Sequence, residues 1–160
     1  DDTLRRQLEP RTSSVKNKLR TLEILASCNI PLNVNMAPII PALNDMEIMD
    51  LVKTVAECGA NSVNYTAVRL NGHNGTLFEN WLEQHYPDRK MKVLNLIKSM
   101  HGGRLHNSVF TKRMRGEGTW ATHIKRVFDL AKNSFIQPYT YPVINFNDFR
   151  RIKHGQLNLF

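Results

Sequence analysis

The sequence predicts an α/β fold in which two parallel strands are followed by a mostly helical part. Three observations predict this: a helix–strand–helix–strand order with short connections, alternating polar and apolar residues in the strands, and helical apolar spacing after the second strand. Parallel sheets are normally covered on both faces and have more than two strands. We therefore expect the remaining strands to come from outside this chain.

The first part of the chain is predicted to be helical. A short helix at residues 2–8 precedes a turn at residues 9–13, and Ser13 or Ser14 can cap a second helix. Asn29 can adopt the left-handed backbone conformation that often ends such a helix. The apolar stripe of the second helix is spaced by four, three and four residues, at Val15, Leu19, Leu22 and Ala26.

Two strand patterns follow. The first, at residues 32–36, leads into a proline-containing loop at residues 38–43. Asn44 with Glu47 resembles a capping box that starts the intervening helix. The second strand is predicted to run from about Ser62 to Leu70.

Both strands carry polar side chains on one face. Such a face suits the interior of a roomy barrel that holds a ligand, because a barrel packed solid would have branched apolar residues there. The alternative is that these side chains simply face solvent. The residues are Asn33, Asn35, Asn64 and Thr66.

After the second strand the apolar spacing is helical. It predicts one helix before Pro87, one that begins at Pro87, and a further helix at residues 119–134. Proline is well suited to the first turn of a helix. A basic, glycine-containing loop at residues 102–118 separates the last two helices. The rest of the chain is rich in Pro and Asn and is predicted to be extended. The parts of the chain are therefore residues 1–70, 71–136 and 137–160.

Composition narrows the class of protein. The apolar fraction of 41% fits a globular chain, and there is neither a run of about 18 apolar residues nor a secretory leader. The start at Asp1 without Met is expected to be an internal boundary or a processed end. A formal charge of +8 favours polyanionic partners, although a basic surface without such a partner is the alternative.

Cysteine and histidine usage points away from a metal site on this chain. Cys28 and Cys58 are far apart and form no C-x-x-C pair; each is expected to close a helix as a small buried thiol. A reduced, cytoplasmic setting is the default for such a chain. His101 and His106 lie on either side of a Gly-Gly turn and are predicted to be surface residues.

Several short strings resemble a known family in collinear order. They are residues 8–14 (LEPRTSS), residues 31–45 (PLNVNMAPIIPALND), residues 68–70 (VRL) and residues 114–116 (MRG). Over most of its length, to about Ser134, the chain resembles radical S-adenosylmethionine proteins of the subgroup related to spore photoproduct lyase, a DNA repair enzyme.

The resemblance implies the C-terminal part of a partial (β/α)6 barrel. In the family, the front half of the barrel holds a [4Fe–4S] cluster on a C-x3-C-x2-C loop, together with a glycine-rich segment for the methionine part of S-adenosylmethionine. Neither motif is present here, and a cluster held by three thiolates cannot form on two distant cysteines. We therefore expect this chain alone to be non-catalytic and to have the missing N-terminal half of the barrel as its partner.

The resemblance also assigns cofactor-binding residues at the strand ends. The loop after the family's fifth strand presents its backbone to the adenine; in this chain it contains Ala37, Pro38, Ile39 and Ile40. Beside it should lie Ala67, Val68 and Arg69. Arg69 can bind a phosphate or the cofactor carboxylate through two hydrogen bonds, or it can point outward to an acidic partner. Arg11 is a weaker candidate.

The basic loop is a candidate nucleic-acid interface. Cations interleaved with aromatic rings suit flipped or single-stranded bases, although Phe110 and Trp120 can equally be core residues below a solvated basic face. In the resembled enzyme the corresponding region engages damaged DNA. The candidate contacts are Arg104, Lys112, Arg113 and Arg115.

The last five residues resemble the peptide that binds the bacterial sliding clamp. Gln156 would form a hydrogen bond at the edge of a groove that Leu157, Leu159 and Phe160 fill. The alternative is a tail that folds back on its own core.

Three functions remain open at this point. The chain can be part of a radical S-adenosylmethionine enzyme acting on nucleic acid, a binding module for nucleic acid and the clamp without chemistry, or a scaffold whose charge is incidental. Exposed strand edges also allow a homo-oligomer.

Overall fold

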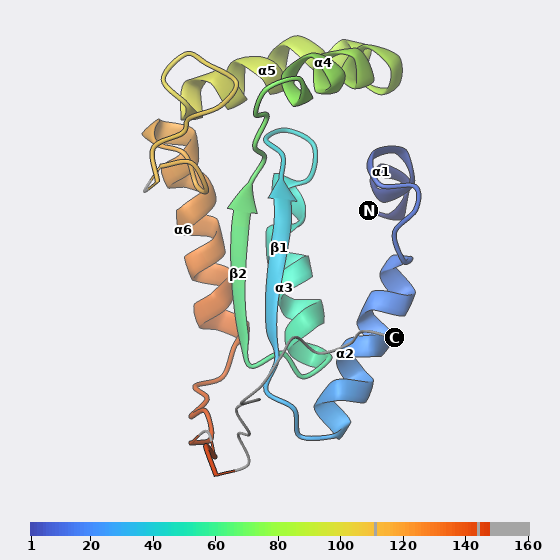
Figure 1. Ribbon diagram of the computed structural model, residues 1–160, viewed down its shortest axis with the longest axis vertical. Helices are drawn as coiled ribbons and strands as arrows, with labels where there is room; N and C mark the ends of the chain where they lie inside the picture. The colour runs from blue at the N-terminus through green and yellow to red at the C-terminus, as the bar shows by residue number, and fades with distance from the viewer. Residues whose placement is uncertain (111, 144, 148–160) are drawn as a thin grey trace, which may run out of the picture.

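A two-stranded parallel sheet forms the centre of the molecule (Figure 1). The computed structural model describes residues 1–110, 112–143 and 145–147. Strand β1 spans Asn33–Ile39 and strand β2 spans Ser62–Ala67. Their register pairs Met36 with Tyr65 and shifts between Met36 and Ile39. The predicted α/β class with two parallel strands is confirmed.

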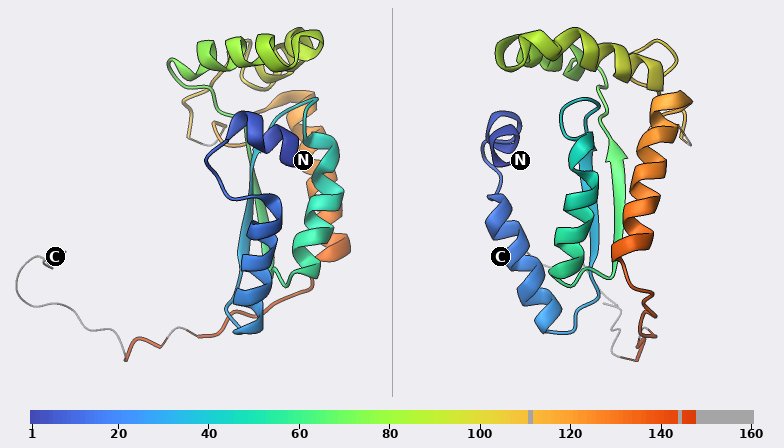
Figure 2. Two further views of the ribbon diagram at one scale, coloured as in Figure 1. Left: turned by 90° about the vertical axis from the view of Figure 1, so that its right-hand side faces the viewer. Right: turned by 180° about the vertical axis from the view of Figure 1, so that it is seen from behind.

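Two helices cover one face of this sheet. They are α3 (Ile48–Glu57), which connects the strands, and α6 (Gly118–Phe135); Figure 2 shows both on the same side. The rings of Tyr65 on β2 and Phe128 on α6 meet with centroids 4.7 Å apart. Since β-strand side chains alternate between faces, Val63, Tyr65 and Ala67 of β2 enter this core. In β1, Met36 enters it, and the register shift brings Ile39 into it as well. Its largest fully buried members include Ile39, Ile48, Val52, Val63 and Ile124.

A second helical layer lies across the carboxyl ends of the strands. It consists of α4 (Asn74–His85) and α5 (Pro87–Met100), with Pro87 in the first turn as expected. The first helix, α1 (Asp2–Leu8), is joined to this layer through Gln7. The backbone carbonyl of Gln7 accepts a hydrogen bond from Trp81 Nε1 (3.1 Å), and its side-chain oxygen accepts one from the Tyr86 hydroxyl (2.7 Å).

Helix α2 (Val15–Ser27) lies beside the outer edge of β1 and has no buried residue. Its start agrees with the prediction: the Ser14 hydroxyl accepts a hydrogen bond from Asn17 N–H, and Asn29 has a positive φ of 56°. The apolar stripe predicted for this helix is only half-buried. It faces a groove of about 250 Å³ shared with β1 and α3. No other strand within the described residues pairs with this edge of β1.

The second face of the sheet carries the polar residues. The side chains of Asn33, Asn35 and Asn64 are exposed, whereas Thr66 is half-buried. Asn64 Nδ2 donates a hydrogen bond to Asn33 Oδ1 across the two strands, at 3.3 Å. In Figure 1, α3 and α6 lie behind the sheet, and in the view from behind in Figure 2 they lie in front of it, so no described helix covers the polar face.

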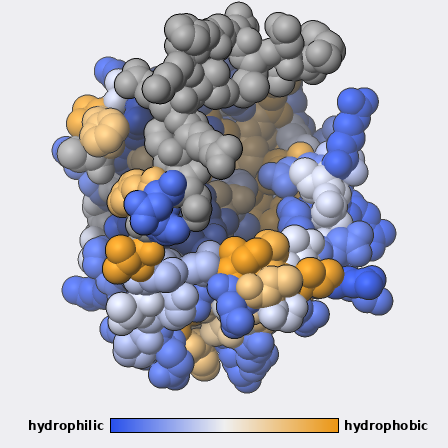
Figure 3. Space-filling view, turned by 60° about the horizontal axis from the view of Figure 1, so that its bottom comes forward, coloured by the Kyte–Doolittle hydropathy of each residue, from blue (hydrophilic) through white to orange (hydrophobic). Residues whose placement is uncertain are grey.

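The amino end of the sheet has a mixed surface. Tyr141 OH donates to Ser62 Oγ at 2.8 Å, and Asn61 Oδ1 accepts from Leu32 N–H at 2.7 Å. In a view that brings this end forward, apolar residues lie in separate small patches between hydrophilic ones (Figure 3). No described helix has the length and apolar character needed to cross a membrane.

The structure corrects the expected strand ends and the capping box. β1 continues through Pro38 to Ile39, because the register shift removes the need for a ladder hydrogen bond at the proline. β2 ends at Ala67 instead of Leu70. Asn44 does not cap α3 with its side chain; it instead bonds backbone groups of the strand end, and a 3-10 turn at Asp45–Glu47 precedes the helix.

Two burial predictions are wrong. Cys28 is exposed, because it ends the half-exposed helix α2; Cys58, which ends α3, is half-buried. His101 is almost completely buried, with 3% of its surface exposed, because the end of α5 is packed against the strand ends.

Candidate ligand cavity at the strand ends

The carboxyl ends of β1 and β2 meet at an open cavity of about 480 Å³. Parallel strands end at the same edge of a sheet, so residues far apart in sequence converge there. One wall is apolar and comes mainly from α4, and the charged residues Glu9 and Arg69 lie elsewhere on the lining. The lining residues used below are Glu9, Pro38, Val68, Arg69 and Trp81.

Arg69 is the best-placed binding group of this cavity. Its Nε is buried and has no hydrogen-bond partner, and its Nη1 lies 3.5 Å from the sulfur of Met114. It takes part in no ion pair within the described residues. Since the guanidinium forms no ion pair and its Nη1 contacts only a weakly accepting sulfur, an anionic ligand would not have to replace a carboxylate partner at its terminal nitrogens.

The structure brings only some of the predicted cofactor residues to the cavity surface. Pro38 and Val68 line the 480 Å³ cavity together with Arg69. Ala37 lines a smaller, neighbouring cavity. The side chains of Ile39, Ile40 and Ala67 are instead in the hydrophobic core. It is therefore the Pro38 ring that presents an apolar surface to the cavity from β1.

The backbone of this strand end is already hydrogen-bonded. Asn44 Oδ1 accepts from Ile40 N–H at 2.7 Å, and Asn44 Nδ2 donates to the Pro38 carbonyl at 3.0 Å. The Ile39 carbonyl accepts from Val68 N–H at 2.9 Å. These bonds fix the position of Pro38 relative to Arg69. They also occupy backbone groups of the loop that was predicted to contact an adenine.

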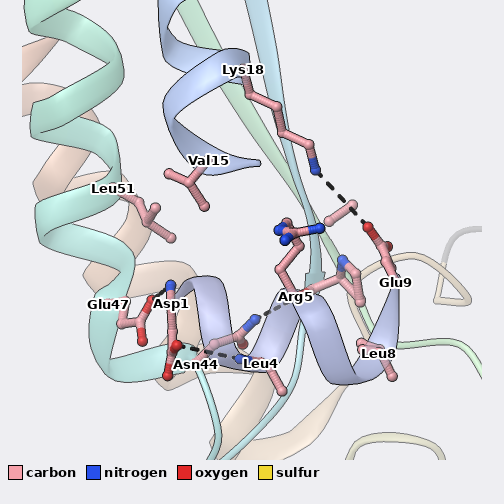
Figure 4. A pocket seen from close by; sticks show the side chains of 12 residues that line it. Asp1, Leu4, Arg5, Leu8, Glu9, Val15, Lys18, Asn44, Glu47 and Leu51 are labelled. Atoms are coloured by element: carbon pink, nitrogen blue, oxygen red, sulfur yellow. Dashed lines mark hydrogen bonds and ion pairs between the residues drawn. The ribbon is translucent and has the colours of Figure 1, made fainter. Parts of the chain in front are cut away.

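The smaller cavity, of about 150 Å³, lies between α1, α2 and the start of α3 (Figure 4). The charged side chains that line it already have partners. Lys18 Nζ lies 4.0 Å from Glu9, and Arg5 donates to Asp2 at 2.7 Å and to the Thr12 carbonyl at 2.8 Å. The two Arg5 bonds leave this side chain less free than Arg69 to bind a ligand.

The basic loop is attached directly to the strand end. The Met114 carbonyl accepts a hydrogen bond from Ala67 N–H at 2.8 Å. Three of the four candidate nucleic-acid contacts already have a partner: Lys112 with Glu117 at 2.6 Å, Arg113 above the Phe110 ring at 4.9 Å, and Arg115 above the Tyr65 ring at 5.3 Å. Arg104 is exposed, and Phe110 has 77% of its surface exposed.

His101 lies behind this site and was missed as a buried residue. Burial lowers its pKa, a backbone hydrogen bond with Val68 opposes this, and His106 and Arg69 lower it further. In its neutral form, the His101 imidazole therefore helps to hold Val68 and Arg69, which follow β2, in place. The signal was present in the sequence: His101 follows Val93 and Ile97 at steps of four residues, on the apolar stripe of α5.

The iron–sulfur cluster does not fit this chain. The described residues contain no group of three His, Cys, Asp or Glu side chains that could hold a metal ion. Cys28 and Cys58 terminate α2 and α3, at the sheet end opposite the cavity. Burial, and then the neighbouring Glu23, raise the pKa of the Cys58 thiol, which disfavours the thiolate that a cluster requires.

The clamp-like residues Gln156, Leu157, Leu159 and Phe160 lie outside the described residues.

Comparison with known proteins gives no family: no family model, no curated protein and no solved structure matches the chain.

Proposed function

We propose that this chain is the C-terminal portion of a radical S-adenosylmethionine enzyme related to spore photoproduct lyase. In this proposal β1 and β2 are two strands of a partial α/β barrel, and a nucleic acid is the substrate. The cluster and the remaining strands belong to polypeptide that this chain does not contain. The observation that carries the proposal is the convergence of Pro38, Val68 and Arg69, from the ends of two parallel strands, on one cavity.

The outer edge of β1 supports the barrel part of the proposal. A further parallel strand at this edge would pair with β1 and bury the apolar stripe of α2, which is only half-buried in the structure. The groove between α2 and β1 is lined on both sides by apolar residues, including Leu19, Leu22 and Val34. A homo-oligomer formed through the same edge is the alternative occupant.

Each residue of the cavity has a defined task in the proposal. Pro38 covers one face of the adenine, Arg69 binds a carboxylate or phosphate oxygen, and the apolar wall that includes Trp81 excludes water. Asn44 and His101 hold the two strand ends in place. The electron for reductive cleavage of S-adenosylmethionine would come from the cluster when it is bound outside this chain.

The first test is the coding sequence upstream of Asp1. We expect it to encode a C-x3-C-x2-C motif followed by a glycine-rich segment. An upstream stop codon with a natural start at this boundary would contradict the proposal.

The second test uses both halves together. The chain, produced with the upstream segment and iron–sulfur loaded, should cleave S-adenosylmethionine to 5′-deoxyadenosine and methionine with dithionite as reductant. Arg69→Gln should weaken the apparent affinity for S-adenosylmethionine by about 10- to 100-fold, the effect of losing a charge-assisted hydrogen bond. Lys132→Gln, on the exposed end of α6, is the matched control and should leave the affinity unchanged. Equal affinities of the two variants for S-adenosylmethionine would show that Arg69 does not bind it.

A second candidate function is nucleic-acid binding without chemistry. The exposed Phe110 ring with Arg113 beside it favours this candidate, because such a pair can stack on an unpaired base. Fluorescence titration of single-stranded and duplex DNA at two salt concentrations tests it. Binding should weaken with salt, and Phe110→Ala should selectively reduce affinity for the single strand; salt-independent or absent binding rejects it.

The clamp interaction has a separate test. Deleting residues 156–160 should abolish binding to a bacterial sliding clamp, with the full-length chain as the control. Unchanged affinity would reject the tail as a clamp ligand.

A further inference from the structure

The connection between β2 and α4 contains an asparagine–glycine pair with an open backbone. It spans residues 68–73, at the carboxyl end of β2 (Figure 1). Asn71 and Gly72 are exposed, Gly72 has a φ of +55°, and a Cβ at Gly72 would have no heavy atom within 4 Å. Among the described residues, the Gly72 N–H donates no hydrogen bond to another backbone group, and the Asn71 side chain has no partner. Both groups are therefore free to move toward each other.

This pair has the groups for an intramolecular reaction. The Gly72 backbone nitrogen loses its proton and attacks Cγ of the Asn71 side chain, a C–N bond forms, and the side-chain nitrogen leaves as ammonia. The product is a succinimide ring, and water opens it at either carbonyl carbon to give an aspartate or an isoaspartate at this position. Glycine favours ring closure because it has no Cβ and its backbone adopts many conformations. The reaction needs no oxidant, cofactor or second protein.

A second asparagine–glycine pair follows closely in the chain and is held in the opposite way. Asn74 is the first residue of α4, and Gly75 is buried. The Gly75 N–H donates to the Gly72 carbonyl at 3.4 Å, and a Cβ at Gly75 would lie 3.3 Å from Leu105. The start of α4 must open before the Gly75 nitrogen can reach the Asn74 side chain, and an unfavourable opening step slows ring closure in proportion. The two pairs therefore share their chemistry and differ in structure.

We propose that Asn71 is a site of self-modification, and that its conversion to aspartate or isoaspartate regulates the strand-end cavity. Asn71 directly follows Leu70, and Leu70 and Asn74 both line that cavity. The modification replaces a neutral amide by a carboxylate, and the isoaspartate form also lengthens the backbone by one methylene group. A chain that has aged therefore carries a new negative charge beside the cavity.

The regulatory part rests on the function proposed above, in which Arg69 binds an anionic group of the ligand. The Cα atoms of Arg69 and Asn71 are two residues apart and so at most about 7 Å from each other. This is within the Debye length of about 8 Å at physiological ionic strength, so the new carboxylate and the Arg69 guanidinium interact. Two opposite unit charges about 7 Å apart in water attract enough to change a binding constant about two- to threefold. Modification of Asn71 should therefore weaken the binding of an anion at Arg69.

Peptide mass spectrometry of the purified 160-residue chain tests the modification. During incubation at mildly alkaline pH, the modified fraction should grow at least about tenfold faster at Asn71 than at Asn74, which is held by the helix. It should grow more slowly at mildly acidic pH, because the attacking nitrogen must lose its proton. In urea, where α4 is unfolded, the two asparagines should react at similar rates. Equal rates in the native chain, or no modification of Asn71 over several weeks, overturn the proposal.

Substitutions connect the modification with the cavity. Gly72→Ala adds a Cβ at a positive φ and should lower the modified fraction at Asn71 to that at Asn74. In the enzyme assembled with its upstream segment, Asn71→Asp should weaken the apparent affinity for S-adenosylmethionine about two- to threefold, whereas the neutral control Asn71→Gln should leave it unchanged. Equal affinities of these two variants would reject the regulatory role. The mass-spectrometric test uses no cofactor, so its outcome does not depend on whether the proposed function is correct.

Discussion

The two faces of the β1–β2 sheet have the same backbone but opposite surroundings. One face carries Val63, Tyr65 and Ala67 into a core beneath α3 and α6. The other carries Asn33, Asn35 and Asn64 into open space. Of the two sheet faces, only the one beneath α3 and α6 contributes buried apolar packing, so the second face adds little to stability and is available for other contacts.

The largest expected effect concerns the covered face. Phe128→Ala removes a buried ring that packs on Tyr65 and should lower the free energy of unfolding by about 3–5 kcal/mol. Asn64→Ala, on the open face, should change it by less than about 0.5 kcal/mol. Urea denaturation measures both, and similar losses in the two variants would contradict the one-sided core.

A slightly smaller effect is expected where α2 joins the covered side. A Cβ on Gly59 would lie 2.5 Å from Ala26 Cβ, and Gly59 has a φ of +94°. Gly59→Ala should therefore cost about 2–4 kcal/mol, from overpacking and backbone strain together. Gly103 has a φ of +85° and open space around it, so Gly103→Ala isolates the strain, about 1–2 kcal/mol. Equal melting temperatures for both variants would show that the contact between Gly59 and Ala26 is unimportant.

The strand end next to the cavity gives the third prediction. Asn44→Ala removes two side-chain hydrogen bonds to the backbone of Pro38 and Ile40, so it should lower the free energy of unfolding by about 1–3 kcal/mol. Asn35→Ala, on the open face, is the matched control. A loss no larger than that of the control would mean that other contacts fix the strand end.

The smallest effect concerns the two thiols. Cys28 is exposed and should react with iodoacetamide faster than Cys58, whose thiol pKa is raised by burial and by Glu23, 3.8 Å from its sulfur. Glu23→Gln removes a negative charge, lowers the Cys58 pKa, and should increase its rate a few-fold near neutral pH. Peptide mass spectrometry follows both rates, and Cys28 is the internal control. An unchanged Cys58 rate would mean that burial alone limits its reactivity.

The sequence predicts the order of elements in this fold well because each signal is local. Ser14, Asn29 and Pro87 act on the turns in which they lie, and apolar spacing reports which residues share a face. Burial is less predictable, since it depends on which elements meet. Cys28 follows α2, a helix with no buried residue, and is exposed. His101 follows α5, which packs against the strand ends, and is buried.

The candidate site was predictable in part for the same reason. Strand parallelism placed Pro38 and Arg69 at one end of the sheet. The use of Asn44 to bind the strand backbone could not be read from its spacing to Glu47, because the capping box and the observed bonds use the same residue. Asp45 and Trp120 are 75 residues apart in the chain and line one cavity, and the burial of their unpaired atoms has no local signal in the sequence.

The bonds of Gln7 to Trp81 and Tyr86 bear on the order of folding. They connect residues 74 and 79 positions apart, and closing so long a loop costs chain entropy before any contact is gained. We expect α1 to dock after α4 and α5 have formed, so that the cavity wall supplied by Glu9 is completed late. Native-state hydrogen exchange should then give the amides of α1 a lower opening free energy than those of α6.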